Sequence, residues 1–227
     1  MDTLAERLGS IERALSDACT ASGRERSSVT LVAVSKRQPN DLFLQAYECG
    51  VRDFGENTLQ GFEARKQWAE EQGLDAIRWH FIGQIQSRKA KAIWGQAAII
   101  HTFDRLKLLR SLSGDHLKSQ EALVQVNIGE EPQKGGVAPA HLRHFVQEAR
   151  ESGARVSGLM CIPPNDGEPQ KWFSMLRDLS EELVAEALLP EAPELSMGMS
   201  SDFVTAVRYG ATLVRVGSSL FGERMTQ

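Results

Sequence analysis

Short apolar runs alternate with longer amphipathic stretches along the chain from Val29 onward. Brief connections rich in Gly, Pro, Asn and Ser separate them, and these residue types mark turns and loops. Such repetition is typical of a parallel sheet whose strands are joined by helices. It predicts eight strands, at residues 30–35, 53–55, 78–82, 98–102, 122–127, 155–160, 194–197 and 212–216.

The amphipathic stretches between these strands indicate helices. Several of them end at a glycine, the residue most common just past a helix C-terminus. Gly50, Gly73, Gly95 and Gly210 occupy such positions. The predicted helices cover residues 40–49, 58–72, 87–94, 104–117, 139–152, 168–188 and 200–209.

One more helix is expected at the N-terminus, before the first strand. Thr3 and Glu6 have the spacing of a capping box, in which each side chain binds the backbone N–H of the other residue. Apolar residues then recur at helical spacing, namely Leu4, Leu8, Ile11 and Leu15. This segment stands outside the strand–helix repeat.

Eight strand–helix units with no break in composition favour a closed parallel (β/α)8 barrel of the TIM type with an extra N-terminal helix. A doubly wound open sheet has the same local pattern and is the alternative. Barrels of 227 residues are commonly single domains, so we expect residues 1–227 to form one domain.

Composition excludes several classes of protein. A net charge of -4 without a Lys/Arg cluster argues against a nucleic-acid partner. No apolar run has the length of a signal peptide core or a membrane span. The 3 cysteines form no CxxC pair and cannot all be paired, which fits a reducing compartment. We therefore expect a cytoplasmic protein, and a monomer. Metal-ligand spacing, a Walker loop and a nucleophile elbow are also missing from the sequence.

Functional residues of such barrels come from the C-terminal ends of strands and the loops that follow. Polar residues and glycines concentrate at these positions. They are Ser35, Lys36, Glu56, Asn57, Gly83, Gln84, His101, Thr102, Asn127, Cys161, Gly198, Met199, Ser200, Ser201, Gly217 and Ser218.

Lys36 ends the apolar run LVAVSK. It shares a strand face with Val32 and Val34, so its amine is expected to point into the mouth of the barrel. Schiff-base chemistry needs a neutral amine, and burial or a nearby cation would lower the lysine pKa from about 10.4. The alternative is a lysine that opens a solvated loop.

Two loops near the C-terminus resemble a phosphate site. GMSSDF follows the seventh predicted strand and RVGSSLFG contains the end of the eighth, the usual phosphate-binding region of these barrels. Ser200, Ser201, Gly217 and Ser218 are the candidate phosphate contacts. Alternatively, the serines cap a helix and Gly217 permits a tight turn.

Arg215 lies within the apolar strand ATLVRVG and must find an acceptor, because its guanidinium stays charged. The ordinary partner is a carboxylate; the functional alternative is the ring nitrogen of a pyridine cofactor. Asn57 and His80 are further candidate cofactor contacts, although Asn57 could be a helix cap and His80 a satisfied core residue. Lys134, in GEEPQKGGV, is either a solvated charge or a second amine near the mouth.

Seven segments occur in the order and at the spacing of a known family. They are LVAVSK, FGENTLQ, WHFIGQIQSRK, VNIGEEPQKGG, GLMCIP, LSMGMSSDF and VRVGSSLFGER. The chain thereby resembles the YggS/PROSC group of pyridoxal 5′-phosphate (PLP) homeostasis proteins. Two departures, Arg88 for a frequent Asn and Ser218-Ser219 for a frequent Thr-Ala pair, remove no needed hydroxyl or amine.

The resemblance implies a barrel like the N-terminal domain of alanine racemase, with PLP as a Schiff base on Lys36. Arg215 would lie beside the pyridine nitrogen, with Ser200, Ser201, Gly217 and Ser218 around the phosphate. It also implies a role in cofactor supply, with PLP-dependent apo-enzymes as partners.

Three functions are compatible with these residues. A PLP carrier without its own turnover is favoured, because a racemase needs a second acid/base opposite the lysine. Tyr47 and Tyr209, the 2 tyrosines, fall in predicted helices, and the chain has no length for a second domain. A small PLP enzyme, such as a weak amino-acid racemase, and a cofactor-free Schiff-base aldolase are the alternatives.

Overall fold

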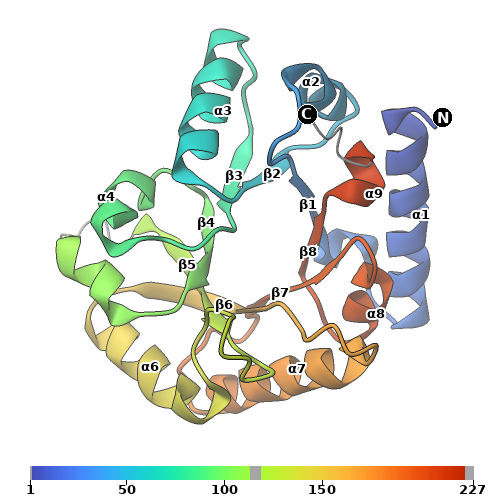
Figure 1. The fold of residues 1–227 in the computed structure, drawn as a ribbon. Helices are drawn as coiled ribbons and strands as arrows, with labels where there is room; N and C mark the ends of the chain where they lie inside the picture. Colours follow the sequence, from blue (N-terminus) through green and yellow to red (C-terminus); the bar gives the residue numbers. More distant parts are fainter. Residues whose placement is uncertain (1, 113–118, 223–227) are drawn as a thin grey trace.

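The computed structural model describes residues 2–112 and 119–222. Its strands form one closed parallel barrel, in which each strand pairs with the next and β8 pairs with β1. Helices surround the strands (Figure 1). The predicted (β/α)8 barrel is confirmed, and the open sheet is excluded because its two edge strands would remain unpaired.

The strands match their predicted ranges to within two residues at each end. A parallel barrel strand is recognisable from sequence because most of its residues are apolar on both faces. The strands are β1 Thr30–Val34, β2 Asp53–Glu56, β3 Arg78–Phe81, β4 Ile99–Phe103, β5 Glu121–Val126, β6 Arg155–Cys161, β7 Glu194–Met199 and β8 Leu213–Val216.

The helices follow the predicted order with changes on one side of the barrel. The α-helices are α1 Leu4–Ala21, α2 Asn40–Glu48, α3 Leu59–Glu71, α4 Ala90–Ile93, α6 Pro139–Glu151, α7 Pro169–Ala185, α8 Phe203–Arg208 and α9 Ser218–Phe221. Short 3-10 helices occur at η1 Arg26–Ser28, η2 Ser87–Lys89 and η3 Leu106–Ser111. None of the helices in the described ranges has both the length and the apolar composition to cross a bilayer.

Two predicted helices differ from the structure. Residues 87–94 divide into η2 and the short α4. In the range 104–117, where a helix was predicted, the described residues form only η3. Its i→i+3 hydrogen bonds run from Leu108 N to Arg105 O and from Leu112 N to Leu109 O. The remainder of this prediction, residues 113–117, lies outside the described part of the chain. Four-residue turns such as α9 are too short to produce a periodic pattern.

The N-terminal capping box is confirmed. The Thr3 hydroxyl accepts a hydrogen bond from Glu6 N at 3.2 Å, and Thr3 N donates to Glu6 Oε2 at 2.7 Å. The buried face of α1, which includes Ile11 and Leu15, packs on α8 and α9 (Figure 1). The extra helix thus supports the two segments that follow β7 and β8.

Apolar residues form two separate clusters. The larger one lies between the strands and the surrounding helices and includes Phe43, Phe54 and Trp94. A smaller cluster fills the inside of the barrel with Val32, Ile99, Leu123, Met160 and Leu213. Side chains beyond this plug, toward the carboxyl ends of the strands, are free to form a site.

Two glycines are expected to respond to alanine substitution in opposite directions. A Cβ on Gly158 would lie 1.9 Å from the carbonyl oxygen of Glu194 on the paired strand β7, whereas a Cβ on Gly9 in α1 would meet its nearest neighbour at 3.5 Å. Gly158→Ala should lower the free energy of unfolding by about 1–3 kcal/mol through overpacking. Gly9→Ala should raise it by about 0.5–1 kcal/mol through helix propensity. Urea denaturation measures both, and equal effects would contradict the strand geometry.

Candidate functional site

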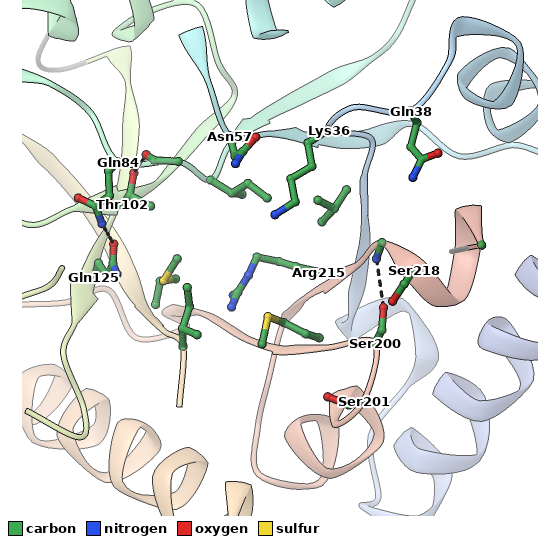
Figure 2. Close-up of a pocket in the computed structure, with 18 residues that line it drawn as sticks. Lys36, Gln38, Asn57, Gln84, Thr102, Gln125, Ser200, Ser201, Arg215 and Ser218 are labelled. Atoms are coloured by element: carbon green, nitrogen blue, oxygen red, sulfur yellow. Dashed lines mark hydrogen bonds between the residues drawn. The ribbon is translucent and has the colours of Figure 1, made fainter. Parts of the chain in front are cut away.

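A cavity of about 770 Å³ opens at the carboxyl ends of the strands (Figure 2). Parallel barrels place these ends at one face, so segments distant in sequence meet there. The lining residues are Val34, Lys36, Gln38, Asn57, Ile82, Gly83, Gln84, Thr102, Gln125, Met160, Ile162, Met199, Ser200, Ser201, Arg215, Gly217, Ser218 and Gly222. Seven of the eight predicted site residues belong to this set; His80 does not.

Lys36 lies two residues after the end of β1, and its amine points into the cavity (Figure 2). Val34 lies on the same wall, as the strand alternation predicts. The preceding Ser35 is fully buried and donates a hydrogen bond to Glu56 Oε1 at 2.8 Å. This bond between β1 and β2 fixes the backbone from which Lys36 projects.

The Glu56 carboxyl lies beside this end of β1, in contact with Ser35 and near Arg65. Burial raises the pKa of its carboxyl, while the Ser35 hydrogen bond and the nearby Arg65 and Lys36 charges oppose the rise. Arg65 Nε lies 3.9 Å from Glu56 Oε1, and the Arg65 guanidinium also donates to the carbonyl of Gln38. The loop after Lys36 is therefore tied to both β2 and α3.

Arg215 projects from β8 into the floor of the cavity, with 4% of its surface exposed. Its Nη1 donates to Ser196 Oγ at 2.6 Å and its Nη2 to the carbonyl of Cys161 at 2.9 Å. No carboxylate in the described ranges forms an ion pair with it, so the ordinary expectation for this arginine is not met. Burial lowers its pKa, although an arginine still remains protonated. Within the described ranges, the guanidinium is thus a buried cation whose hydrogen bonds go to neutral groups.

The two C-terminal loops meet through Ser200. Its hydroxyl accepts hydrogen bonds from Gly217 N and Ser219 N, each at 3.3 Å. Ser201 and Ser218 lie on the same side of the cavity (Figure 2). The helix-cap alternative for the serines is wrong, because the N-cap residue of α8 is Asp202. Backbone N–H groups and three hydroxyls are therefore grouped where an anion can accept from them.

Gly198 allows the first of these loops to turn. Its φ is 89°, and a Cβ there would lie 2.5 Å from Ala206 Cβ. The pairing of β7 with β8 shifts register between Ser196 and Met199, next to this glycine. The shift directs the residues after β7 toward the cavity.

Polar residues of β2 to β5 form the opposite wall (Figure 2). Asn57 lies there, and it is not a helix cap, since Thr58 caps α3. Thr102 Oγ1 donates to the carbonyl of Gly83 at 2.5 Å, and Gln84 Nε2 donates to Gln125 Oε1 at 2.7 Å. The hydrogen bonds hold these side chains in place.

His80 is the predicted site residue that the structure places elsewhere. It is fully buried inside the barrel, with Nδ1 2.9 Å from His101 Nε2 and Nε2 2.9 Å from Asp53 Oδ1. The alternative of a satisfied core histidine is the one observed. His80 points inward from the middle of β3, one level below the residues that reach the cavity.

Lys134 and Asn127 also lie away from the cavity lining. The Lys134 amine forms an ion pair with Glu131 and donates to the carbonyl of Pro163 at 2.9 Å. Asn127 Nδ2 donates to the carbonyl of Glu131 at 2.9 Å. Both side chains therefore shape the loop after β5, and Lys134 is neither a free solvated charge nor a second amine in the site.

Sequence reasoning did not single out Gln38, Gln125 or Ser196. Gln125 and Ser196 lie in apolar strands in the same phase as residues that face the barrel interior, Leu123 and Met160 among them. A polar residue at an inward position of an apolar strand was thus an available signal. Gln38 had no such signal, because it lies in a loop.

The cavity is cationic. Among its lining residues, the ones with basic side chains are Lys36, which follows β1, and Arg215, which lies on β8 at the floor of the cavity. Two cations together with grouped N–H and hydroxyl donors suit a small molecule that bears negative charge. An amine that points into the cavity adds a nucleophile.

Comparison with known proteins agrees with this geometry. Residues 18–225 match the family model described as alanine racemase, N-terminal domain. A relative from Aquifex aeolicus, named pyridoxal phosphate homeostasis protein, is 38% identical over 96% of this chain and 97% of its own. The PLP-bound structure of PipY from Synechococcus elongatus is 34% identical, with a TM-score of 0.81, over 97% of this chain and 100% of PipY.

The fold is also that of alanine racemase. The enzyme from Corynebacterium glutamicum superposes with a TM-score of 0.67 at 14% identity, over 98% of this chain and 61% of the racemase chain. At 14% identity, this similarity shows only that the two proteins share the barrel fold.

The thiols should react in an order set by burial. Cys49 is exposed, Cys19 and Cys161 are buried, and burial raises the pKa of the Cys161 thiol to about 12. Since the thiolate is the reactive form, we expect one fast-reacting thiol per native chain at pH 8. All 3 should react after unfolding. Titration with a chromogenic disulfide measures this, with Cys49→Ser as the control. A second fast thiol would contradict the burial of Cys19 or Cys161.

Proposed function

This chain belongs to the alanine racemase N-terminal domain family and, within it, to the pyridoxal phosphate homeostasis proteins, and we propose that it binds PLP on Lys36 in order to store and supply the cofactor. The binding is proposed to be covalent, as a Schiff base between the Lys36 amine and the cofactor aldehyde. The observation that carries the proposal is the meeting of Lys36, Arg215 and the Ser200–Gly217 loops in one cavity.

The residues present fit PLP group by group. The Lys36 amine supplies the nucleophile, and the N–H groups of Gly217 and Ser219 with the hydroxyls of Ser200, Ser201 and Ser218 supply donors for a phosphate. Arg215 forms no ion pair with a carboxylate in the described part of the chain, and it supplies a donor for the pyridine nitrogen. Asn57 is proposed to line the cofactor from the opposite wall, whereas His80 does not reach it.

PLP, when bound, supplies an aldehyde that captures amines and a ring that withdraws electrons. Arg215 limits the second property. A guanidinium has donors only, so a ring nitrogen that accepts from it stays unprotonated and is a weaker electron sink. This residue favours holding the cofactor over driving carbanion chemistry.

The lining of the cavity also supports a carrier without substrate turnover. Racemisation requires a second acid/base opposite the lysine, within hydrogen-bond reach of the substrate carbon. Tyr47 donates to the carbonyl of Asp75, and Tyr209 is the C-cap of α8, so neither tyrosine lines the cavity. Besides Lys36, the only ordinarily titratable lining group in the described ranges is Arg215, which does not deprotonate.

We further propose that residues 1–227 act as one cytoplasmic, monomeric PLP-binding domain that delivers the cofactor to PLP-dependent apo-enzymes. Cys19, Cys49 and Cys161 are free thiols, which suits a reducing compartment. Ile162 is the one large hydrophobic residue exposed in the described part of the chain. Stable self-association usually needs a larger apolar patch.

Lys36→Ala should abolish the visible absorbance that wild-type protein acquires with PLP. The change removes the only amine that lines the cavity in the described ranges. Borohydride reduction followed by peptide mass spectrometry should place the cofactor on Lys36 in the wild type. Lys134→Ala is the matched control and should keep full absorbance, because Lys134 is tied to Glu131 and Pro163. An unchanged spectrum in Lys36→Ala would assign the cofactor to another lysine.

If the protein is a carrier, the PLP-loaded form should produce less than one molecule of product per protein molecule when it is incubated with a panel of amino acids. The reason is that no second acid/base lines the cavity among the described residues. In parallel, an apo-enzyme should be reactivated by the loaded protein faster than PLP dissociates into buffer. Sustained turnover would make the protein an enzyme, and reactivation at the dissociation rate would make it a passive reservoir.

A further inference from the structure

A continuous polar chain crosses the inside of the barrel from its base to Arg215. Asp53 Oδ1 lies 2.9 Å from His80 Nε2, and His80 Nδ1 lies 2.9 Å from His101 Nε2. His101 Nδ1 lies 2.7 Å from Ser196 Oγ, which accepts from Arg215 Nη1 at 2.6 Å. His80, His101 and Ser196 are each fully buried. The chain thus joins β2, β3, β4, β7 and β8 through side chains alone.

Its two ends differ chemically. Asp53 is the partly exposed outer end, and its carboxylate also pairs with Arg78 Nη1 at 3.3 Å. Arg215 is the inner end, at the floor of the cavity. A carboxylate only accepts hydrogen bonds and a guanidinium only donates them. Each group between these ends must therefore accept a hydrogen bond from one neighbour and donate one to the next.

Counting donors gives a single satisfied arrangement for neutral imidazoles. Asp53 requires the His80 hydrogen on Nε2, which leaves His80 Nδ1 as an acceptor. His101 must then carry its hydrogen on Nε2 and accept at Nδ1. The Ser196 hydroxyl donates to His101 Nδ1, and its oxygen is left to accept from Arg215. Every hydrogen then points away from Arg215 and toward Asp53.

The reverse direction leaves a group unsatisfied. It needs a cationic His80 that donates to His101, which in turn donates to Ser196. Ser196 Oγ would then accept twice, and its hydrogen has no other acceptor in the described ranges. It would also enclose a second cation in the barrel with Arg215. A cationic His101 that donated to both His80 and Ser196 is disfavoured as well, because burial, followed by His80 and Arg215, lowers the pKa of His101 well below its ordinary value.

From this geometry we propose that Asp53, His80, His101 and Ser196 are positioning residues that fix the Arg215 guanidinium for the ring nitrogen of PLP. The chain holds the Ser196 oxygen as an acceptor, which with the Cys161 carbonyl locks the guanidinium plane. The inference rests on the proposed function for the identity of the ligand. The direction of the hydrogen bonds, in contrast, is a property of the protein without any ligand.

Nitrogen-15 NMR of the cofactor-free protein tests the direction. We expect both His80 and His101 to carry hydrogen on Nε2 and none on Nδ1. Asp53→Asn introduces an amide that can accept or donate, so signals of the opposite tautomer should appear at both rings. Arg78→Gln removes the ion pair at Asp53 but no link of the chain, and its spectrum should match the wild type. Hydrogen on Nδ1 of either ring in the wild type would overturn the proposal.

Ser196 variants test the action on Arg215. Ser196→Ala should broaden the Arg215 guanidinium signals of the cofactor-free protein, because one of its two acceptors is lost. It should also weaken PLP binding by about 10-fold, the low end for a lost hydrogen bond to a charged group. Ser196→Thr keeps the hydroxyl and should restore both values. Sharp guanidinium signals in a folded Ser196→Ala protein, or loss in Ser196→Thr equal to that in Ser196→Ala, would overturn the positioning role.

The two readouts separate failure of the function from failure of this inference. If the wild type does not bind PLP, the tautomers and guanidinium signals still decide whether the chain fixes Arg215. If PLP binds on Lys36 but its affinity is unchanged in Ser196→Ala, the hydrogen-bonded side chains from Asp53 to Ser196 have only a structural role.

Discussion

The pairing of β8 with β1 is the contact on which the site depends. It places Val32 opposite Arg215 and Ala33 opposite Val216, so Gly217 lies next to Val34, and Lys36 follows two residues later at the same end of the barrel. Residues from opposite ends of the chain thereby share one cavity. Closure also removes both sheet edges, so the carboxyl ends of the eight strands surround one opening.

Most of the fold was predictable from local pattern. The strands are apolar on both faces and the helices end at glycines, and both signals act over a few residues. The capping box of Thr3 and Glu6 is equally local. Where the local signal was weak, as in η2 and η3, prediction gave regular helices and the structure has 3-10 turns.

The site was predictable only in part, for a related reason. Lys36, Asn57 and the serine loops follow strands, and strand ends of a barrel meet at one face. His80 was misplaced because a strand position gives the direction of a side chain and not its level in the barrel. Its chain to Arg215 runs through His101 and Ser196, which are 95 residues apart in sequence. Partners this distant become visible only when the barrel closes.

Ser200 gives the cavity a property that bears on delivery. Its hydroxyl already accepts from the N–H groups of Gly217 and Ser219, the donors proposed for the cofactor phosphate. An incoming phosphate would therefore replace the Ser200 hydroxyl as the acceptor of these two N–H groups, which are hydrogen-bonded in the empty cavity as well. A protein that releases its cofactor to another protein must remain folded when it is empty, and the Ser200 hydroxyl keeps these two backbone N–H groups hydrogen-bonded in that state.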